Sequence, residues 1–343
     1  MSALELRGVS HAFGDVDVLH DISFSVTSGT ITALLGPSGV GKTTLLRIIC
    51  GFETPQRGTV TINDRVVARD GESLVAPEHR GVGLVPQEGA LFPHLTVAEN
   101  IAFGLQRRRS PIARQRVQQM LQLVDLAECA DRRPHELSGG MQQRVALARA
   151  LAPNPAIVLL DEPFASLDAA LRITVRTEIV DALRRSQATA LWVTHDQQEA
   201  LSCADEVAVL LDRRIAQHGA PVDLYRTPLT RSIAEFVGEA VRVHGVANGS
   251  RATSALGELD LAQPQHGDVT VIVRPEQIEL DDTRNPHSPQ GRVIASRFYG
   301  HDGEIDVQLS NGEVVVARLH ARLLPAVGSD VALRITGQVL AFA

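Results

Sequence analysis

The stretch "GPSGVGKTT" at residues 36–44 decides the fold, because it fits the pattern G-x-x-x-x-G-K-[ST] of a phosphate-binding loop. The apolar run "TITALLG" (30–36) predicts a strand before it, and "KTTLLRIICG" (42–51) predicts a helix after it that is closed by Gly51. The motif requires this position between a strand and a helix. An ordinary glycine-rich turn is the simpler interpretation of a bare pattern, and this context argues against it.

The loop predicts a set of contacts with a nucleotide. Its backbone N–H groups turn inward around the β-phosphate, and the dipole of the following helix adds positive potential. We expect Lys42 to bridge the β- and γ-phosphates, Thr43 to coordinate Mg²⁺, and Thr44 to reach the α-phosphate. The other residues expected to contact the nucleotide are Gly36, Pro37, Ser38, Gly39, Val40 and Gly41.

A second motif supplies carboxylates. The buried strand predicted for "AIVLLDEP" (156–163) ends in Asp161, which we expect to hold Mg²⁺ through Thr43 or a water. Glu162 follows and can orient an attacking water on the γ-phosphate. Taken alone, an Asp-Glu pair after a strand is more simply a helix cap. Its combination with the phosphate loop favours the nucleotide site.

A histidine lies at the end of another predicted strand, "TALWVTH" (189–195). Open α/β sheets bind ligands at the carboxyl ends of their strands. His195 can therefore hydrogen-bond a γ-phosphate there, although a structural histidine is the simpler interpretation at this point.

The alternation of elements predicts two domains. Residues 1–235 alternate short apolar runs with helical patterns, which predicts an α/β domain with a mostly parallel central sheet. A helix over 171–186 and a hairpin over 206–219 complete it. Residues 236–343 carry short alternating strands and the turn signal "SNGE" (310–313), which predict a small all-β, barrel-like domain.

Composition limits the function classes. The 343 residues are 44% hydrophobic with a net charge of −7, which is typical of a soluble globular protein and argues against a nucleic-acid partner. Cys50, Cys129 and Cys203 lie far apart, which favours buried, inert thiols in a reducing compartment. The sequence has no apolar run of membrane-span length and no signal-peptide pattern, so we expect a cytoplasmic protein that docks on a membrane partner.

The stretch "LSGGMQQRVALARAL" (137–151) narrows the class, because a Ser and two glycines precede a helix-forming run. With this stretch, the chain resembles the ATP-binding subunits of ABC transporters over essentially its whole length. A P-loop kinase would need neither "LSGG" nor His195. The resemblance implies a P-loop NTPase domain of the ABC ATPase type with a helical subdomain, ATP and Mg²⁺ as cofactors, and hydrolysis of ATP.

The resemblance also implies roles for single residues. Phe13, in "HAFG" (11–14), takes the place of the aromatic residue that stacks on adenine. Gln87 takes the place of the glutamine that touches Mg²⁺ and water, and residues 88–105 resemble the surface that receives the membrane permease. His195 resembles the switch histidine of the family.

The signature residues imply a dimer. Ser138, Gly139 and Gly140 would face a γ-phosphate bound by Lys42 of a second copy, in a head-to-tail pair that closes on ATP. Asp168, in "SLD" (166–168), belongs to the loop that crosses this interface. The usual glutamine after the second glycine is replaced by Met141, which cannot complete a capping box with Ser138 and so forgoes about 1 kcal/mol or less.

The C-terminal stretches "VIVRPEQIEL" (271–280) and "GRVIASRFYGHDGEIDVQL" (291–309) resemble the OB-like regulatory domain (TOBE type) of importer ATPases. This implies a peripheral subunit on the cytoplasmic face of a bacterial inner membrane, coupled to permease subunits and, indirectly, to an extracytoplasmic solute-binding protein. The stretch 86–105 and the signature look most like the ferric-iron branch. Import of polyamine, sulfate, molybdate or sugar stays open, and a soluble non-transport ABC ATPase is a remote alternative because the chain shows a single cassette.

Overall fold

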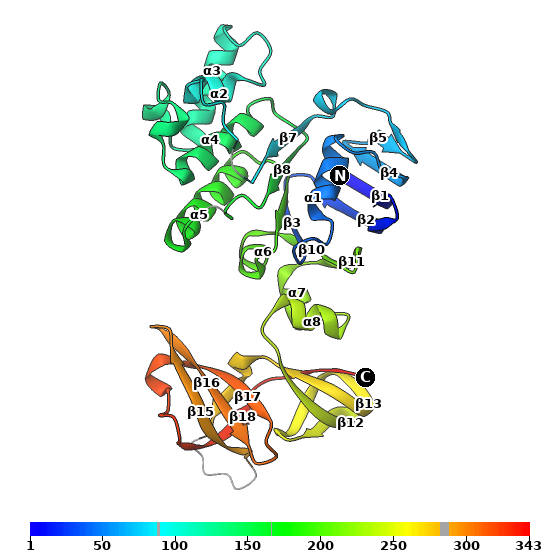
Figure 1. Cartoon of the computed structure of the whole chain (residues 1–343), viewed down its shortest axis with the longest axis vertical. Coiled ribbons are helices and arrows are strands. Elements are labelled where there is room, and N and C mark those ends of the chain that lie inside the picture. The colour runs from blue at the N-terminus through cyan, green and yellow to red at the C-terminus, as the bar shows by residue number, and fades with distance from the viewer. Residues whose placement is uncertain (88–89, 166, 282–287) are drawn as a thin grey trace. The chain divides into compact units, whose positions relative to one another are not determined.

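The computed structural model describes residues 1–87, 90–165, 167–281 and 288–343 (Figure 1). The chain divides into two compact units, Met1–Val222 and Asp223–Ala343. The helices α7 (Pro221–Arg226) and α8 (Arg231–Val237) lie at this division. Helix α8 folds with the second unit, where the carbonyl of Ala234 accepts a hydrogen bond from Nη1 of the buried Arg274 at 2.9 Å. The predicted domain boundary at 235/236 stays a prediction.

A six-stranded sheet forms the centre of the first unit, in the order β11-β10-β3-β9-β8-β7. Neighbouring strands from β10 to β7 pair in parallel, and only β11 is antiparallel to its neighbour. Every residue of β3 and β9 is buried, as expected for strands covered on both faces. This confirms the predicted parallel sheet and the terminal hairpin. The strands are β3 (Ile31–Leu35), β7 (Val82–Val85), β8 (Ile157–Asp161), β9 (Ala190–Thr194), β10 (Glu206–Leu211) and β11 (Arg214–Gly219).

A second, antiparallel sheet lies in the N-terminal part, in the order β2-β1-β4-β5-β6, and the sequence did not predict it. Helix α1 (Lys42–Cys50) lies between the two sheets (Figure 1), because its residues Leu45, Ile48 and Ile49 share one apolar core with strands of both. The strands are β1 (Ser2–Phe13), β2 (Val16–Thr27), β4 (Arg57–Ile62), β5 (Arg65–Arg69) and β6 (Glu72–Ser73).

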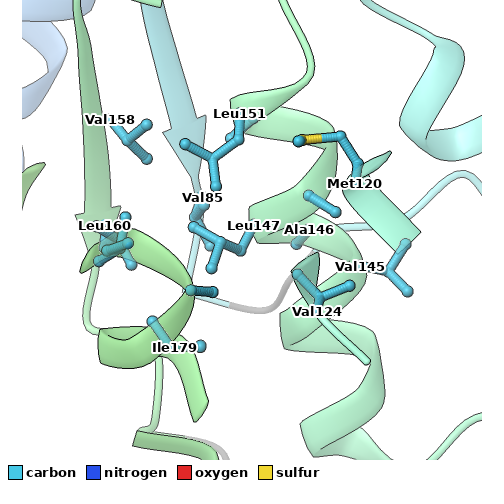
Figure 2. Packing of buried hydrophobic residues seen from close by; sticks show 14 of the residues in the cluster. Val85, Met120, Val124, Val145, Ala146, Leu147, Leu151, Val158, Leu160 and Ile179 are labelled. Atoms are coloured by element: carbon cyan, nitrogen blue, oxygen red, sulfur yellow. The ribbon is translucent and has the colours of Figure 1, made fainter. Parts of the chain in front are cut away.

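Helices cover the other face of the central sheet. Figure 2 shows Leu147 and Leu151 of α4 packed toward Val158 and Leu160 of β8, with Met120 of α3 on the opposite side of α4. The helices of the first unit beyond α1 are α2 (Val97–Ala102), α3 (Pro111–Leu123), α4 (Gly139–Leu151), α5 (Ala169–Arg185) and α6 (Gln197–Cys203), with 3-10 turns at Pro77–His79, Ala127–Cys129 and Pro134–Glu136. None of the described helices combines the length and the apolar character that a membrane crossing needs.

The second unit contains two antiparallel sheets, β12-β13-β19 and β14-β18-β15-β16-β17 (Figure 1). Both contribute to one apolar core, which includes Val243, Val271 and Ile305. The predicted Asn-Gly turn joins β16 to β17, with Gly312 at φ 88°. The strands are β12 (Val241–Ser254), β13 (Gly257–Val273), β14 (Ile278–Leu280), β15 (Gln290–Phe298), β16 (Asp302–Leu309), β17 (Val314–His320), β18 (Asp330–Ile335) and β19 (Leu340–Phe342), with 3-10 turns at Pro275–Gln277 and Ala321–Leu323.

The three cysteines, Cys50, Cys129 and Cys203, are free and buried, which confirms the expectation of buried thiols. Burial raises the pKa of Cys50 to about 12, so its thiolate is scarce at neutral pH.

Candidate active site

The phosphate loop joins the end of β3 to the start of α1, as the sequence predicts. Gly41 precedes the helix with φ 109°, a conformation that favours glycine. A Cβ atom there would lie 2.8 Å from the carbonyl oxygen of Val18, and one on Gly36 would lie 2.6 Å from that of Leu210. The backbones of β2 and β10 therefore require both glycines, whatever the loop binds.

Lys42 points back into this loop. Its Nζ donates hydrogen bonds to the carbonyl oxygens of Gly36 (2.8 Å) and Pro37 (2.9 Å), and it lies 3.8 Å from Glu162 Oε1. Only 5% of its side chain is exposed. Burial lowers the pKa of Lys42, and the charges of Glu162 and Asp161 oppose that shift. The ammonium group is thus held at the mouth of the loop among carbonyl and carboxylate oxygens.

The two carboxylates lie where β8 ends. Glu162 has φ 42°, which is uncommon for a residue with a side chain, and its N–H donates to the Val193 carbonyl at 3.0 Å. Its Oε2 lies 3.1 Å from Nδ1 of His195. Burial raises the pKa of Asp161, Glu162 raises it further, and Lys42 opposes both. The structure therefore brings together Lys42, Glu162 and His195, which the sequence selected from three separate motifs.

The signature stretch starts helix α4, as expected. Ser138 is the N-cap residue, and its Oγ accepts from the Met141 N–H at 3.4 Å. Gly140 is buried, and a Cβ atom on it would lie 2.4 Å from Cγ2 of Val175. Met141 packs against the core beneath α4, which gives this methionine a structural reason that the sequence did not reveal.

Asp168 has a comparable local role. It is the N-cap residue of α5, and its Oδ1 accepts from the Leu171 N–H at 2.9 Å. Ser166, in the same predicted loop, lies outside the described residues. Among the described residues, no hydrogen bond or ion pair joins Asp168 or Ser138 to Lys42.

Two further predicted residues lie on different elements. The carbonyl of Gln87 accepts from Nε2 of the buried Gln143 at 3.2 Å, which ties this loop to α4. Phe13 ends β1 with 49% of its surface exposed, and its ring meets the ring of His11 edge-to-face at 4.7 Å between centroids. An exposed, supported phenyl ring is suited to stacking on a flat heterocycle.

A small polar cavity that no sequence motif predicted lies beside Glu162 and His195. Its volume is about 90 Å³, and it is also lined by Arg172, Thr194 and Glu199. Glu199 is 5% exposed, and burial raises its pKa, while a hydrogen bond from Thr194 opposes that shift. The pattern Asp-x-x-Glu at 196–199 resembles a helix capping box, so it predicts an exposed carboxylate and gives no signal for this cavity.

A groove of about 520 Å³ runs along part of the segment expected to contact a permease. The rings of Phe92 and Phe103 lie 4.1 Å apart between centroids, and Arg108 covers the Phe103 ring at 4.2 Å. Arg149 lies 5.4 Å above Phe92 and donates to the Ala90 carbonyl at 2.9 Å. Residues 88 and 89, at the start of that segment, lie outside the described residues.

Comparison with known proteins shows the family to which the chain belongs. The chain is 46% identical over 350 residues to the Fe(3+) ions import ATP-binding protein FbpC 1 of Rhodococcus jostii, covering 99% of both chains. The sequence model described as ABC transporter matches residues 19–165. The chain belongs to the ATP-binding proteins of ABC transporters. This ABC ATPase also matches the model described as TOBE domain over residues 271–342.

Other relatives agree with that assignment. The ABC ATPase is 44% identical over 348 residues to the Fe(3+) ions import ATP-binding protein FbpC of Pseudomonas fluorescens, covering 98% of this chain and 97% of the relative. Among solved structures, cbiO1 of Clostridium perfringens, part of the ABC transporter complex cbiONQ, matches with a TM-score of 0.59 at 26% identity, over 66% of this chain and 91% of that one.

The family confirms the resemblance inferred from the sequence, the ABC ATPase fold with a TOBE domain, and ATP as the nucleotide. The chain is an ATPase of the ABC type, whose hydrolysis is coupled to transport.

Proposed function

We propose that this ABC ATPase is the energy-coupling subunit of a bacterial importer that depends on a solute-binding protein, and that its cargo is ferric iron. The observation that carries the proposal is similarity over the full length, TOBE domain included, to proteins named for Fe(3+) import. As such a subunit, it would dock on permease subunits at the cytoplasmic face of the membrane. It would meet the solute-binding protein only through them.

For the reaction, we propose that Lys42 contacts the β- and γ-phosphates and that Glu162 orients the attacking water. Glu162 is suited to this role because Lys42 and His195 both lie close to its carboxylate. His195 is half exposed beside it and would hydrogen-bond the γ-phosphate. Phe13 would stack on the adenine ring.

The oxygen donors Thr43, Asp161 and Gln87 would hold Mg²⁺, which takes hydroxyl, carboxylate and amide oxygens. Asp161 fits a cation, because burial and the neighbouring Glu162 both raise its pKa, and a nearby positive charge relieves that destabilisation. Bound Mg²⁺ would neutralise negative charge on the phosphate oxygens of ATP.

The working form that we propose is a head-to-tail dimer. Ser138 and Gly139 are exposed at the start of the 13-residue helix α4, and the positive end of a helix dipole attracts phosphate. They would meet the γ-phosphate bound by a second copy, with Gly140 contributing only its backbone N–H. Asp168 caps α5 and would lie in the loop that crosses between the copies.

The permease surface that we propose is the described part of residues 88–105. Its aromatic pair, Phe92 and Phe103, lines an open groove with Arg149 at its edge. A groove that combines aromatic rings with charged side chains such as Arg149 is suited to an amphipathic helix of a partner protein.

The first experiment tests the ATPase assignment. Glu162→Gln keeps the shape of the side chain but removes its charge, so we expect ATP binding to persist while turnover falls by about 100-fold or more. The mutant should accumulate as an ATP-bound dimer in size-exclusion chromatography. Glu72→Gln, the same change on the exposed strand β6, should hydrolyse ATP normally. Near wild-type turnover of Glu162→Gln would reject Glu162 as the residue that orients water.

Two further measurements complete the test. Lys42→Ala should lose ATP affinity in a fluorescent-nucleotide titration, and retained affinity would contradict the loop assignment. For the cargo, cells lacking this subunit should regain uptake of radioactive ferric iron with the wild-type chain but not with Glu162→Gln. Restored uptake of sulfate or polyamine instead of iron would contradict the cargo and leave the importer assignment standing.

A further inference from the structure

The hydroxyl of Thr194, the residue before His195, bridges two residues that follow His195, Asp196 and Glu199. It donates to Glu199 Oε2 at 2.7 Å and accepts from the Asp196 N–H at 2.9 Å. Thr194 ends β9 and Asp196 is the N-cap residue of α6, so His195 is the one residue between these two. The position of its ring beside Glu162 therefore depends on a short chain of bonds that ends at Glu199.

An ordinary capping box does not explain this arrangement. In such a box, the carboxylate of the third helical residue accepts from the N–H of the N-cap residue. Here the Asp196 N–H donates to the Thr194 hydroxyl, and that hydroxyl donates to the Glu199 carboxylate. Only the other half of the box is present, in which Asp196 Oδ1 accepts from the Glu199 N–H at 3.1 Å.

The burial of Glu199 indicates that its carboxylate does more than cap the helix. A glutamate that only caps a helix can stay in water, whereas this one is 5% exposed, and burial raises its pKa. Burying a carboxylate is unfavourable, and an apolar side chain of similar size would avoid that penalty. Its oxygen accepts from Thr194 and faces the cavity that also contains Glu162 and His195.

We propose that Glu199 is a positioning residue for ATP hydrolysis, which fixes His195 beside Glu162 through the hydroxyl of Thr194. This inference rests on the roles proposed above for His195 and Glu162. Glu199 itself touches neither ATP nor water in this scheme. It fixes the orientation of the His195 side chain at the end of β9.

The test compares variants of the full chain that either lose or keep one hydrogen-bonding group, the carboxylate of Glu199 or the hydroxyl of Thr194. Glu199→Leu removes the acceptor at similar volume, and we expect kcat to fall by about 10- to 100-fold, because small misplacements near the chemistry are costly. The KM for ATP should change by less than about twofold, since the loop that binds the phosphates is untouched. Glu199→Gln keeps an oxygen that accepts from Thr194 and should retain most of the activity. Thr194→Val and Thr194→Ser form a second pair, in which only serine keeps the hydroxyl.

A double-mutant cycle with His195→Ala separates positioning from a general structural effect. If Glu199 acts through His195, adding Glu199→Leu to His195→Ala should lower kcat no further. If the two changes multiply, or if Glu199→Leu alone hydrolyses ATP at the wild-type rate, the inference is overturned. Should Glu199→Leu fail to fold, the Thr194→Val and Thr194→Ser pair decides the same question.

The outcomes also distinguish this inference from the proposed function. A slow His195→Ala with normal Glu199→Leu rejects only the inference. A His195→Ala variant with the wild-type rate rejects the role proposed for His195, and the inference with it.

Discussion

Gly140→Ala tests whether the second glycine of the signature is required by packing. The added Cβ would lie 2.4 Å from Val175 Cγ2, more than 1 Å inside the usual carbon–carbon separation of about 3.5–4.0 Å. Val175 is 1% exposed and β-branched, so it cannot rotate away easily. Overpacking lowers stability by about 1–3 kcal/mol, and a clash this deep with a buried side chain should cost the upper part of that range, about 2–3 kcal/mol. Alanine gains about 1 kcal/mol over glycine in a helix, so we expect the free energy of unfolding to fall by about 1–2 kcal/mol.

Thermal unfolding of the full chain, followed by circular dichroism, measures this effect. For a unit of this size, the loss corresponds to a fall in Tm of about 2–8 °C. Gly139→Ala is the matched control, because its Cβ would meet only the flexible end of Leu167 at 3.1 Å, and its effect should be within about 0.5 kcal/mol. In Gly140→Ala with Val175→Ala, the clash is gone, so the two losses should fall short of additivity by about 1 kcal/mol or more. An unchanged Tm for Gly140→Ala, or full additivity, would refute the packing argument.

Two further predictions concern Met141, which is partly buried, and the three buried cysteines. Met141→Gln should change the free energy of unfolding by less than about 1 kcal/mol, because a regained capping bond is offset by lost packing against the core. ATPase activity should change by no more than a few-fold. A rise of about 100-fold would show that the native signature is impaired. Iodoacetamide at pH 8 should modify none of the three cysteines in the folded chain and all three in denaturant. The reason is that they are buried, and burial raises the pKa of Cys50 to about 12. Detection of alkylated Cys50 in the native protein by mass spectrometry would contradict this.

The strands that carry the motifs were predictable, whereas the N-terminal sheet was not. The strands β3, β8 and β9 are continuous apolar runs that end at a recognisable motif. Strand β1 pairs with β2 through several register shifts, and Gly8 within it has φ 62°. These bulges interrupt the alternation of buried and exposed residues, which is the signal by which a half-buried strand is read from sequence.

The residues of the site that directly follow strands were predictable, whereas Glu199 was not. Glu162 and His195 each follow a strand, and parallel neighbours bring such ends together at one edge. Glu199 was not predictable, because Asp-x-x-Glu at a helix start predicts an exposed carboxylate that bonds to the backbone. From the sequence, Met141 predicts only the loss of a capping hydrogen bond, whereas the structure shows that its partly buried side chain packs against the core.

The order of the strands explains why these groups converge on the end of β9. That strand lies between β3 and β8, so its last two carbonyls can reach the loops that follow both neighbours. The Val193 carbonyl accepts from the Glu162 N–H at 3.0 Å, and the Thr194 carbonyl accepts from the Gly36 N–H at 3.4 Å. Since the Thr194 side chain also holds the His195 segment, one strand end fixes the phosphate loop, the carboxylate of Glu162 and the histidine relative to one another. Loss of the Thr194 hydroxyl should therefore act on the His195 segment, whereas the phosphate loop and Glu162, which are held by backbone carbonyls of β9, should keep their positions.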